Sequence, residues 1–484
     1  MSDSTLSAAA VAAPVPLLIA GAPATGASAA PVRFPWDGST AAMVAQAGAA
    51  EVDAALTAAV AALPATAALP RSRRAAILKE LADRVEARGA ELADRLLSET
   101  GKTVRETRLE VQRAVGTLRF CAEAATRTVG EVLPLDAMPG ADGRIGMTVA
   151  EPVGVVAGIP AFNFPLLIAA HKLGPAIGAG CPVVIKPPDQ TPLAILALAE
   201  EALAAGWPAG AISVLPGPAD VARALTEDPR VALVSFTGSS AVGRRVASQS
   251  ALKRLMLELG SNAATIVLAD GNLDWAVERC AAGGYGAAGQ SCISVQRLYV
   301  ARERHAELVE RLAARVGALR AGDPRLETTD VGPVIDDASA ERIEAVVADA
   351  VERGARIVVG GGRDGRLVQP TLLDGLTTAM RLQREEVFGP VVAVAAVDSL
   401  DGAIALANDS PYGLAAGVFT DSLDDAWRAV RGLQAGNVHV NEISGWRADH
   451  MPYGGVKDSG YGKEGPAYAM AEMTHFKTVS FRTG

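Results

Sequence analysis

The sequence predicts an α/β protein whose strands form parallel, doubly wound sheets. Short β-branched apolar runs recur along the chain, among them "VGVVAGI" (153–159) and "VALVSFTG" (231–238), and such runs are typical of strands buried on both faces. Helical patterns lie between most of them, as in "TPLAILALAEEALAAGW" (191–207). Strands and helices that alternate in this way favour a parallel sheet covered by helices.

The chain is expected to begin with a low-complexity tail over residues 1–30, which are rich in Ala, Pro and Ser. No Lys or Arg precedes Arg33, which argues against a secretory signal because such a signal begins with basic residues. The apolar stretch 153–170 has the length of a membrane span, but Pro165 would break a helix there. We therefore expect a buried strand, a loop and a helix in this stretch.

Two helical patterns follow the tail, at 71–102 with Gly101 as its stop and at 104–129. A first set of strand patterns then runs to about residue 268. A second set predicts a second α/β domain, with Cys292 near its start, and comprises 295–302, 355–361, 389–398 and 436–442.

Two extended pieces lie outside these sets, at 131–152 around a Pro-Gly and an Asp-Gly turn and at 474–482. Because neither has a sheet of its own in the sequence pattern, we expect them to pair with a neighbouring subunit.

The composition limits the function classes. With 484 residues, 50% of them hydrophobic and 20% charged, the chain can form two or three globular domains. A net charge of −9 argues against nucleic acid or an anionic membrane as the main partner. The four cysteines are scattered, without the spacing of a metal site or a disulfide framework, so we expect no metal and a reducing, cytoplasmic location.

Cys292 lies in "GYGAAGQSCISVQR" (284–297), where small residues precede it and leave room for a substrate beside the thiol. A catalytic thiol and a buried filler both fit this local pattern. The filler is the expected role of the other three cysteines, Cys121, Cys181 and Cys280.

Two further residues fit chemistry at a strand end. Glu258 stands between Leu257 and Leu259 near the end of a strand pattern, so its carboxyl group is expected among apolar residues. Burial there would raise the pKa of this carboxyl and make it a candidate general base. Asn163 follows a strand, between two prolines, where a fixed amide could stabilise an oxyanion. A surface glutamate and a helix-capping asparagine are the alternatives.

Other residues at strand ends suit a dinucleotide. "VVIKPPDQTP" ends a strand with Lys186 and Asp189, and a carboxylate there can bind a ribose diol. "SFTGSSAVG" ends another strand with Gly238 and Ser239 and starts a helix, which can hold a phosphate although it is not a GxGxxG motif.

Seven motifs occur together in one order and spacing: "FNFPL", "KPPDQTP", "FTGSSAVG", "LELGSN", "GQSCIS", "EEVFGPVV" and "MPYGGVKDSGYGKEG". With this set the chain resembles the aldehyde dehydrogenase superfamily over nearly its whole length, from "FPWDGS" to "HFKTVSF".

The resemblance implies a Rossmann-like NAD(P)-binding domain (31–129 and 151–260), an α/β catalytic domain (261–450) and a β oligomerisation arm (130–150 and 468–484). It also implies a homodimer or homotetramer. Mapped by motif, Cys292 corresponds to the nucleophile, Glu258 to the general base and Asn163 to the oxyanion donor. The other implied residues are Lys172 in a supporting role and, for the cofactor, Lys186, Asp189, Gly238, Ser239, Glu386 and Phe388.

The implied reaction is NAD(P)-dependent oxidation of an aldehyde to an acid through a thioester on Cys292, which water activated by Glu258 hydrolyses. Glu258 disfavours a CoA-acylating enzyme, and the presence of both groups disfavours a non-catalytic scaffold member. An esterase-like thiol hydrolase is a further alternative, and it would differ from a dehydrogenase in needing no nicotinamide cofactor. Asp189 favours NAD, although aspartate is shorter than the glutamate common at this position and leaves NADP open.

The substrate is less defined. "EISGWRADHMPYGG" resembles the subgroup of lactaldehyde, phosphonoacetaldehyde and non-phosphorylating glyceraldehyde-3-phosphate dehydrogenases. Arg113 and Arg447 are placed as in members that bind anionic aldehydes, with solvated arginines as the alternative. Phe164 and Ser291 stand where phosphate-binding relatives tend to have polar or basic residues. We therefore expect a small or semialdehyde-type substrate with at most one carboxylate, and a broad-specificity enzyme is the alternative.

Overall fold

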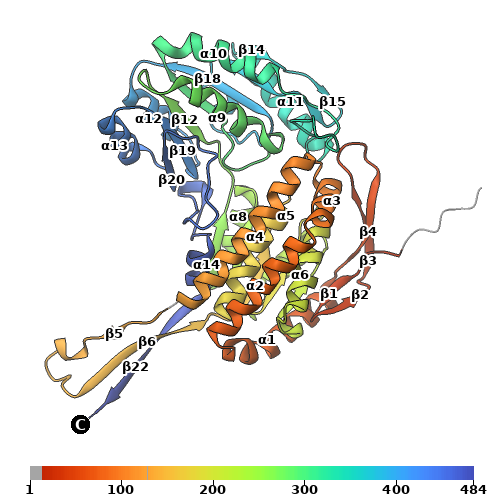
Figure 1. The fold of residues 1–484 in the computed structure, drawn as a ribbon, viewed down its shortest axis with the longest axis vertical. Coiled ribbons are helices and arrows are strands. Elements are labelled where there is room, and N and C mark those ends of the chain that lie inside the picture. Colours follow the sequence, from red (N-terminus) through yellow and green to blue (C-terminus); the bar gives the residue numbers. More distant parts are fainter. Residues whose placement is uncertain (1–12, 128, 484) are drawn as a thin grey trace, which may run out of the picture.

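A computed structural model describes residues 13–127 and 129–483. The chain folds into two lobes, each built around one sheet, and a narrow arm extends from the lower lobe (Figure 1). The chain passes from the first sheet to the second between Glu258 and Ala264, next to the predicted domain boundary at 260/261. The last strand pattern of the expected first set forms β12 (Ala264–Val267) in the second sheet, because an apolar run does not show which sheet it joins.

The first sheet has eight strands in the order β2-β1-β9-β8-β7-β10-β11-β21. Its five central strands are parallel, and the flanking β1 and β21 run antiparallel to their neighbours. The bounds are β1 Leu17–Ile19, β2 Ala22–Ala24, β7 Val155–Ile159, β8 Val183–Ile185, β9 Ile212–Val214, β10 Val231–Thr237, β11 Arg254–Glu258 and β21 Gly460–Tyr461.

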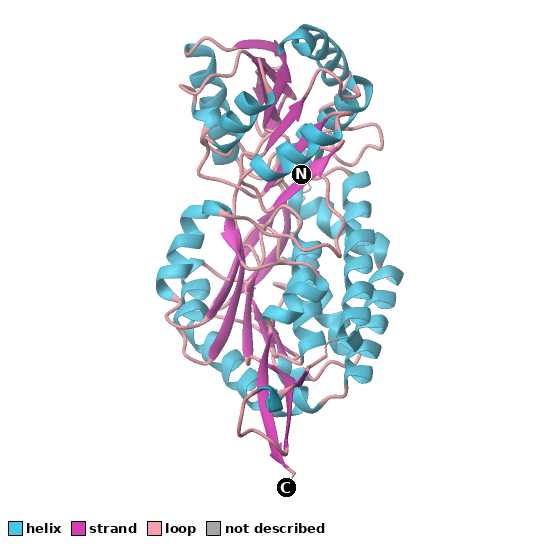
Figure 2. Cartoon of the chain, turned by 90° about the vertical axis from the view of Figure 1, so that its left-hand side faces the viewer, coloured by secondary structure: helices cyan, strands magenta, loops and turns pink. Residues whose placement is uncertain are grey.

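Helices cover both faces of this sheet, as Figure 2 shows. On one face they are α2 (Arg71–Ala87), α3 (Gly89–Thr100), α4 (Val104–Arg127), α5 (Pro165–Ala179), α6 (Leu193–Ala204) and α14 (Pro466–Glu472). On the other they are α1 (Ala49–Ala68), α7 (Ala219–Glu227) and α8 (Ser240–Gln249). The helix predicted over 71–102 is two helices, and the second ends at Gly101 in a left-handed conformation, as its sequence predicts.

The second sheet has seven strands in the order β14-β17-β18-β13-β12-β19-β20, all parallel except the edge strand β14. Their bounds are β12 Ala264–Val267, β13 Arg297–Ala301, β14 Arg356–Val359, β17 Thr371–Asp374, β18 Val391–Val397, β19 Ala415–Phe419 and β20 Asn437–Val440. The helices of this lobe are α9 (Leu273–Tyr285), α10 (Arg302–Gly317), α11 (Asp337–Glu352), α12 (Leu400–Asn408) and α13 (Leu423–Gly432).

The arm is a three-stranded sheet of β5 (Val132–Leu133), β6 (Arg144–Pro152) and β22 (Thr474–Arg482). The expectation that its extended pieces have no sheet of their own is wrong, because β6 and β22 pair with each other along their full lengths. The two strands are more than 300 residues apart in the sequence, so no local pattern predicts their pairing. A small hairpin of β15 (Arg363–Asp364) and β16 (Leu367–Val368) lies in the other lobe.

The predicted tail over 1–30 is corrected for its described part. Residues 1–12 lie outside the described residues, but β1 and β2 join the first sheet, and β3 (Ser28–Arg33) pairs with β4 (Thr40–Gln46). Ala- and Pro-rich composition concealed these short strands. The following helix α1 is long and apolar enough to cross a membrane by length and composition, and here it packs Val52, Leu56 and Ala59 into the core beneath the first sheet.

The carboxyl ends of the parallel strands lie together along one edge of the first sheet. From β7 the chain continues to β8 and β9 on one side, whereas β10 and β11 lie on the other side of β7, so the strand order reverses between β7 and β10. Such a reversal of strand order is the usual ligand-binding position in doubly wound sheets. Asn163 follows β7, Lys186 follows β8, Ser239 follows β10, and Glu258 ends β11.

Candidate active site

Cys292 lies in the loop that joins a short 3-10 turn (Gly286–Gly289) to β13. Its Sγ is 3.1 Å from the Tyr453 hydroxyl oxygen. Burial raises the pKa of the Cys292 thiol to about 12, while the hydrogen bond with Tyr453 and the charge of Arg447 favour the thiolate. The thiol is therefore neutral in this arrangement, and its ionisation depends on these two neighbours.

Asn163 lies at the other side of the same loop. Its Nδ2 donates a hydrogen bond to the carbonyl oxygen of Gln290, two residues before the cysteine, at 2.9 Å. Its Oδ1 is buried without a hydrogen-bond partner. The structure thus brings the amide next to the Cys292 loop, where Nδ2 can reach an oxyanion once it leaves the Gln290 carbonyl.

Glu258 is buried at the end of β11, and neither carboxyl oxygen has a hydrogen-bond partner. Burial raises its pKa well above the ordinary value, and the negative charge of Glu464 raises it further. Its backbone carbonyl accepts the Gly238 N–H at 3.0 Å, which ties it to the β10 end. A buried carboxyl without a partner is the environment in which a general base near neutral pH is found.

Lys172 on α5 is buried, and its charge opposes the rise in the pKa of Glu258. Its Nζ donates to Ser235 Oγ at 3.1 Å and Thr237 Oγ1 at 2.9 Å, and it lies 3.8 Å from Glu464 Oε1. Burial lowers the pKa of Lys172, and the nearby carboxylates oppose that shift. The lysine therefore links the β10 strand to the carboxylates of the pocket.

Arg447 contacts several of these groups at once. Its Nη2 is 3.1 Å from Glu464 Oε2 and 3.1 Å from His171 Nε2, and its guanidinium lies 3.9 Å above the Tyr453 ring centre. Burial lowers the pKa of His171, so its imidazole is neutral. A half-buried cation thus stacks on the ring whose hydroxyl contacts Cys292.

Arg113 on α4 joins the same network through Asp449. The guanidinium holds the Asp449 carboxylate by two hydrogen bonds, of 2.9 and 2.7 Å, and Arg447 Nε lies 3.6 Å from the same carboxylate. The two hydrogen bonds and the charge of Arg113 lower the pKa of Asp449 below its usual range, although burial opposes that shift. Both candidate anion-binding arginines therefore converge on Asp449.

Phe164 and Ser291, the two departures from phosphate-binding relatives, lie beside the pocket. The Phe164 ring has Lys102 Nζ at 4.2 Å and the Arg113 guanidinium at 5.9 Å from its centre. Ser291 is half-buried next to Cys292. The aromatic ring covers Lys102, which is itself buried.

The residues predicted for the cofactor are divided between two places. Lys186 is buried and forms an ion pair with the exposed Asp189, at the carboxyl end of β8. Ser239 caps α8, since its hydroxyl accepts the Val242 N–H at 3.4 Å, and Gly238 precedes it. This first place offers a carboxylate, a lysine and a helix N-terminus, which are the groups that an adenosine ribose and a diphosphate need.

Glu386 and Phe388 form the second place, nearer to Cys292. Glu386 Oε1 accepts the Ser261 N–H at 2.9 Å, and burial raises the pKa of this carboxyl to about 7. A Cβ at Gly260 would lie 2.3 Å from Glu386 Oε2, so glycine at this position leaves the carboxylate where it is. Phe388 has a positive φ of 45° and packs edge-on against Phe162. A ribose diol fits a carboxylate held in this way, so the two places suit the two ends of NAD(P).

Residues 23–479 match the Aldehyde dehydrogenase family. The chain belongs to this family. It is 46% identical over 404 residues, covering 83% of the chain and 85% of the relative, to 3-sulfolactaldehyde dehydrogenase of Priestia megaterium. As a member of this family the protein is an oxidoreductase that oxidises aldehydes with NAD or NADP.

Solved structures agree with this assignment. Aldehyde dehydrogenase 21 from Physcomitrella patens, in complex with the reaction product succinate, superposes with a TM-score of 0.95 at 37% identity over 97% of this chain and 98% of that one. Glyceraldehyde-3-phosphate dehydrogenase of Methanocaldococcus jannaschii, in complex with NADP, gives 0.90 at 34% identity over 93% and 98%. The predicted fold class and subgroup resemblance are confirmed.

Sequence reasoning gave no role to several residues of this pocket. Tyr453 and Glu464 stand in the quoted motif "MPYGGVKDSGYGKEG", and His171 precedes Lys172, but only the folded chain shows their contacts. Among residues 13–127 and 129–483, no group of three or more His, Cys, Asp or Glu side chains could hold a metal ion.

Proposed function

We propose that this enzyme oxidises a small aldehyde with one anionic group, of the semialdehyde type, and releases the free acid by hydrolysis. The position of Arg447 carries the proposal: this half-buried cation stacks on Tyr453, which contacts the Cys292 sulfur. The names of the relatives support it, since 3-sulfolactaldehyde and succinate are both anionic.

The charges of the pocket support a single anionic group. Arg113 and Arg447 face the carboxylates of Asp449 and Glu464, so their charges are balanced before a substrate binds. Lys172 adds one further cation to this cluster, and burial lowers its pKa. With one cation in excess, the cluster compensates the single negative charge of such a substrate better than the two negative charges of a phosphate group.

In the first half of the proposed reaction, the Cys292 thiol passes its proton to water, and Sγ forms a bond to the aldehyde carbon. The Tyr453 hydroxyl and the Arg447 charge stabilise the sulfur anion before attack. The carbonyl oxygen becomes an oxyanion that accepts hydrogen bonds from Asn163 Nδ2 and the Cys292 N–H. Asp189, Ser239 and Glu386 would hold NAD(P), which would supply the acceptor for the hydride that leaves the carbon, and Cys292 would then carry a thioester.

In the second half, Glu258 in its carboxylate form takes a proton from a water molecule, and the hydroxide adds to the thioester carbon. The C–S bond then breaks, which releases the acid and restores Cys292. Because the pKa of Glu258 is raised, the carboxyl binds this proton readily near neutral pH. Lys172 and the buried Glu464 set the field in which it does so.

NAD is the proposed preferred cofactor. Asp189 is an exposed carboxylate at the β8 end, where it would accept hydrogen bonds from a ribose 2′-hydroxyl and repel a 2′-phosphate. Its pairing with Lys186 weakens that repulsion, which leaves some use of NADP. Comparison of kcat/KM with the two cofactors tests this choice, and a clear preference for NADP would contradict it.

The substrate proposal is tested by following NADH formation with purified protein across matched aldehydes of similar length. The set comprises neutral, carboxylated, sulfonated and phosphorylated members, with Cys292→Ala as the control without a nucleophile. We expect the singly charged acidic aldehydes to give the highest kcat/KM. Equal turnover of neutral and acidic members would instead favour a broad-specificity enzyme.

We also propose that the arm joins subunits into a homodimer or homotetramer in the cytoplasm. Apolar side chains on the arm are exposed, including Val132, Ile145, Phe476 and Phe481, which a partner subunit would cover. The four cysteines are free, and Cys292 must stay reduced to react. Sedimentation analysis of the wild type and of Phe476→Ser/Phe481→Ser tests the assembly, and cell fractionation tests the location. A monomeric wild type would contradict the assembly.

A further inference from the structure

Helix α4 belongs to the first lobe, but its N-terminal end is attached to the second. Its body packs against α2 and α5. At its start, the Val104 N–H donates to the Pro324 carbonyl oxygen at 2.9 Å, and Arg105 donates to the Thr329 carbonyl oxygen at 2.8 Å. The first turns of α4 are therefore fixed to both lobes, near the place where Asn163 contacts the loop of Cys292.

Glu106, in the first turn of α4, holds the loop that precedes Cys292. Its Oε1 accepts the Ala287 N–H at 2.5 Å, and its Oε2 accepts the backbone and hydroxyl hydrogens of Thr103. Ala287 and Ala288 have φ values of 51° and 53°, in the left-handed region that alanine adopts only at a cost. Such a conformation persists where the surroundings hold it, and this hydrogen bond contributes to that.

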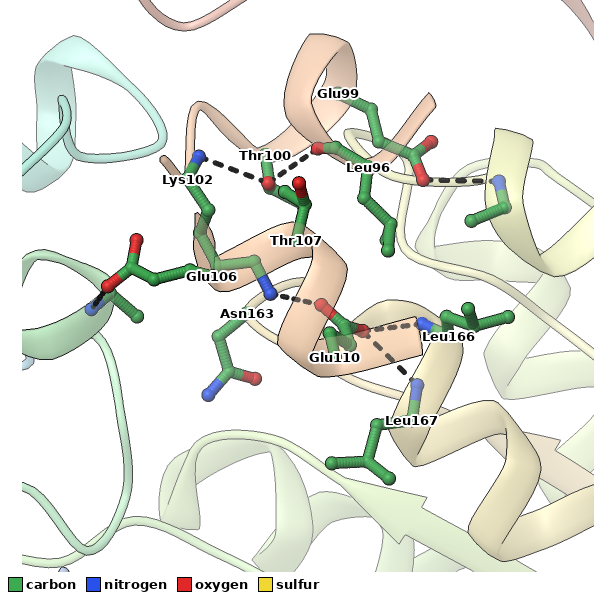
Figure 3. Close-up of polar contacts among 12 residues, drawn as sticks. Leu96, Glu99, Thr100, Lys102, Glu106, Thr107, Glu110, Asn163, Leu166 and Leu167 are labelled. Carbon is green, nitrogen blue, oxygen red and sulfur yellow. Dashed lines mark hydrogen bonds and ion pairs between the residues drawn. The ribbon is translucent and has the colours of Figure 1, made fainter. Parts of the chain in front are cut away.

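Glu110, one helical turn later on the same face, holds the segment after Asn163 (Figure 3). Its Oε1 accepts the N–H groups of Leu166 at 2.9 Å and Leu167 at 3.1 Å, in the first turn of α5. Its other oxygen forms a buried ion pair with Lys102. The carboxylate satisfies two free amides of a helix N-terminus, which fixes the direction in which α5 begins.

We propose that Glu106 and Glu110 are positioning residues that together set the distance between the nucleophile and the oxyanion donor. One rigid helical turn separates the two carboxylates, and each holds the backbone of one of the two loops. The hydrogen bond from Asn163 to the Gln290 carbonyl shows that these loops are already in contact. The inference rests on the roles proposed for Cys292 and Asn163.

The test for Glu106 measures hydrolysis of p-nitrophenyl acetate, a neutral ester that needs the thiol and the oxyanion site but neither NAD(P) nor an anion-binding group. Rates are expressed per thiol that reacts in an active-site titration, so misfolded protein does not count. Glu106→Ala is expected to lower kcat by about 10- to 100-fold, because small displacements of reacting groups cost that much. Glu106→Gln keeps an acceptor for Ala287 and should retain kcat within about threefold.

Glu123→Ala, on an exposed turn of the same helix, is the matched control and should behave as the wild type. KM should change little in the Glu106 variants, since the ester binds without Glu106. A Glu106→Ala variant with wild-type kcat per titrated thiol would overturn the proposal. So would equal losses in Glu106→Ala and Glu106→Gln, which would show that the charge matters and the hydrogen bond does not.

Glu110 is tested with two double variants, because a single substitution would leave Lys102 buried without its partner. Lys102→Met/Glu110→Gln keeps an acceptor for the α5 amides, whereas Lys102→Met/Glu110→Leu removes it. We expect the first to keep kcat within about threefold and the second to lose about tenfold or more. Equal rates per titrated thiol would overturn the role of Glu110.

Failure of the proposed function is distinguishable from failure of this inference. If the wild type hydrolyses the ester and does not oxidise acidic aldehydes, the substrate proposal fails and the Glu106 and Glu110 results still decide the inference. If Cys292→Ala hydrolyses the ester at the wild-type rate, the proposed nucleophile fails, and the inference fails with it.

Discussion

On the β11 side of the active site, Glu258 is buried without any hydrogen-bond partner, whereas on the side formed by residues 443–465 Glu464 lies against cations. Burial raises the pKa of Glu258 well above its usual value. Lys172 and Arg447 hold the pKa of Glu464 below its usual value, although it is buried as well.

The difference shows how one pocket keeps two carboxyl groups in opposite states. Burial penalises charge in both, and only the neighbouring cations decide which group stays ionised. A carboxyl group with a raised pKa can exchange protons during turnover, while a paired one holds the surrounding cations in place. The comparison predicts large effects where the unpaired group is changed and smaller, more selective effects where the paired network is changed.

Glu258→Gln should have the largest effect, because it removes the only group proposed to take a proton from water. We expect hydrolysis of the thioester to slow by about 10²- to 10⁴-fold. In a rapid-mixing experiment, one equivalent of NADH per active site should form before turnover stops. Absence of this burst, with Cys292→Ala as the blank, would show that Glu258 acts before the thioester.

The wild-type rate should also depend on pH in a direction set by Glu258. Below its raised pKa the carboxyl is protonated and cannot accept a proton, so the hydrolytic rate should rise as the pH rises through that pKa. The measurement is steady-state kcat against pH with a saturating aldehyde. A kcat that is flat from pH 5 to 9 would contradict the raised pKa.

Arg447→Met removes the cation that pairs with Glu464 and should change the selectivity for acidic over neutral aldehydes. The ratio of kcat/KM for a carboxylated aldehyde to that for a neutral aldehyde of equal length should fall by about 10- to 100-fold, the worth of a charged hydrogen bond. Arg447→Lys keeps the charge and should retain part of the ratio. Equal losses for both aldehydes would restrict Arg447 to supporting Tyr453 and Glu464.

Tyr453→Phe removes the hydroxyl group that contacts the Cys292 sulfur. Loss of its hydrogen bond should raise the pKa of Cys292, which the hydroxyl lowers. Alkylation by iodoacetamide between pH 8 and 9 should therefore slow about tenfold, because the thiolate is the reactive form. An unchanged alkylation rate would show that Tyr453 does not stabilise the thiolate.

Asp189 belongs to neither the Glu258 side nor the Glu464 side of the active site, so Asp189→Ser should have the smallest effect. Removal of an exposed carboxylate frees Lys186 and should raise the ratio of kcat/KM with NADP to that with NAD by about two- to fivefold. The rate of ester hydrolysis, which needs no cofactor, serves as the control and should not change. A fall in the NADP ratio would contradict the role proposed for Asp189.

Much of this fold could be predicted because its information is local. Buried parallel strands appear as β-branched runs, so β7, β8, β9, β10 and β12 were all recognisable. The strands β1 and β2 were missed because each is only three residues long, and β2 consists of alanine and proline. The pairing of β6 with β22 was missed because no local pattern marks a partner so distant in the chain.

The candidate site divides in the same way. The sequence by itself determined the family, the order of the strands' functional ends and the residues proposed as nucleophile, base and oxyanion donor, because each stands in a short motif whose chemistry depends on residue type. Tertiary structure alone decided that Tyr453 contacts the thiol, that Arg113 and Arg447 share Asp449, and that two glutamates of α4 hold the loops on either side of the pocket. Pairing and desolvation arise between segments that lie far apart in the chain, and the direction in which each pKa shifts depends on them.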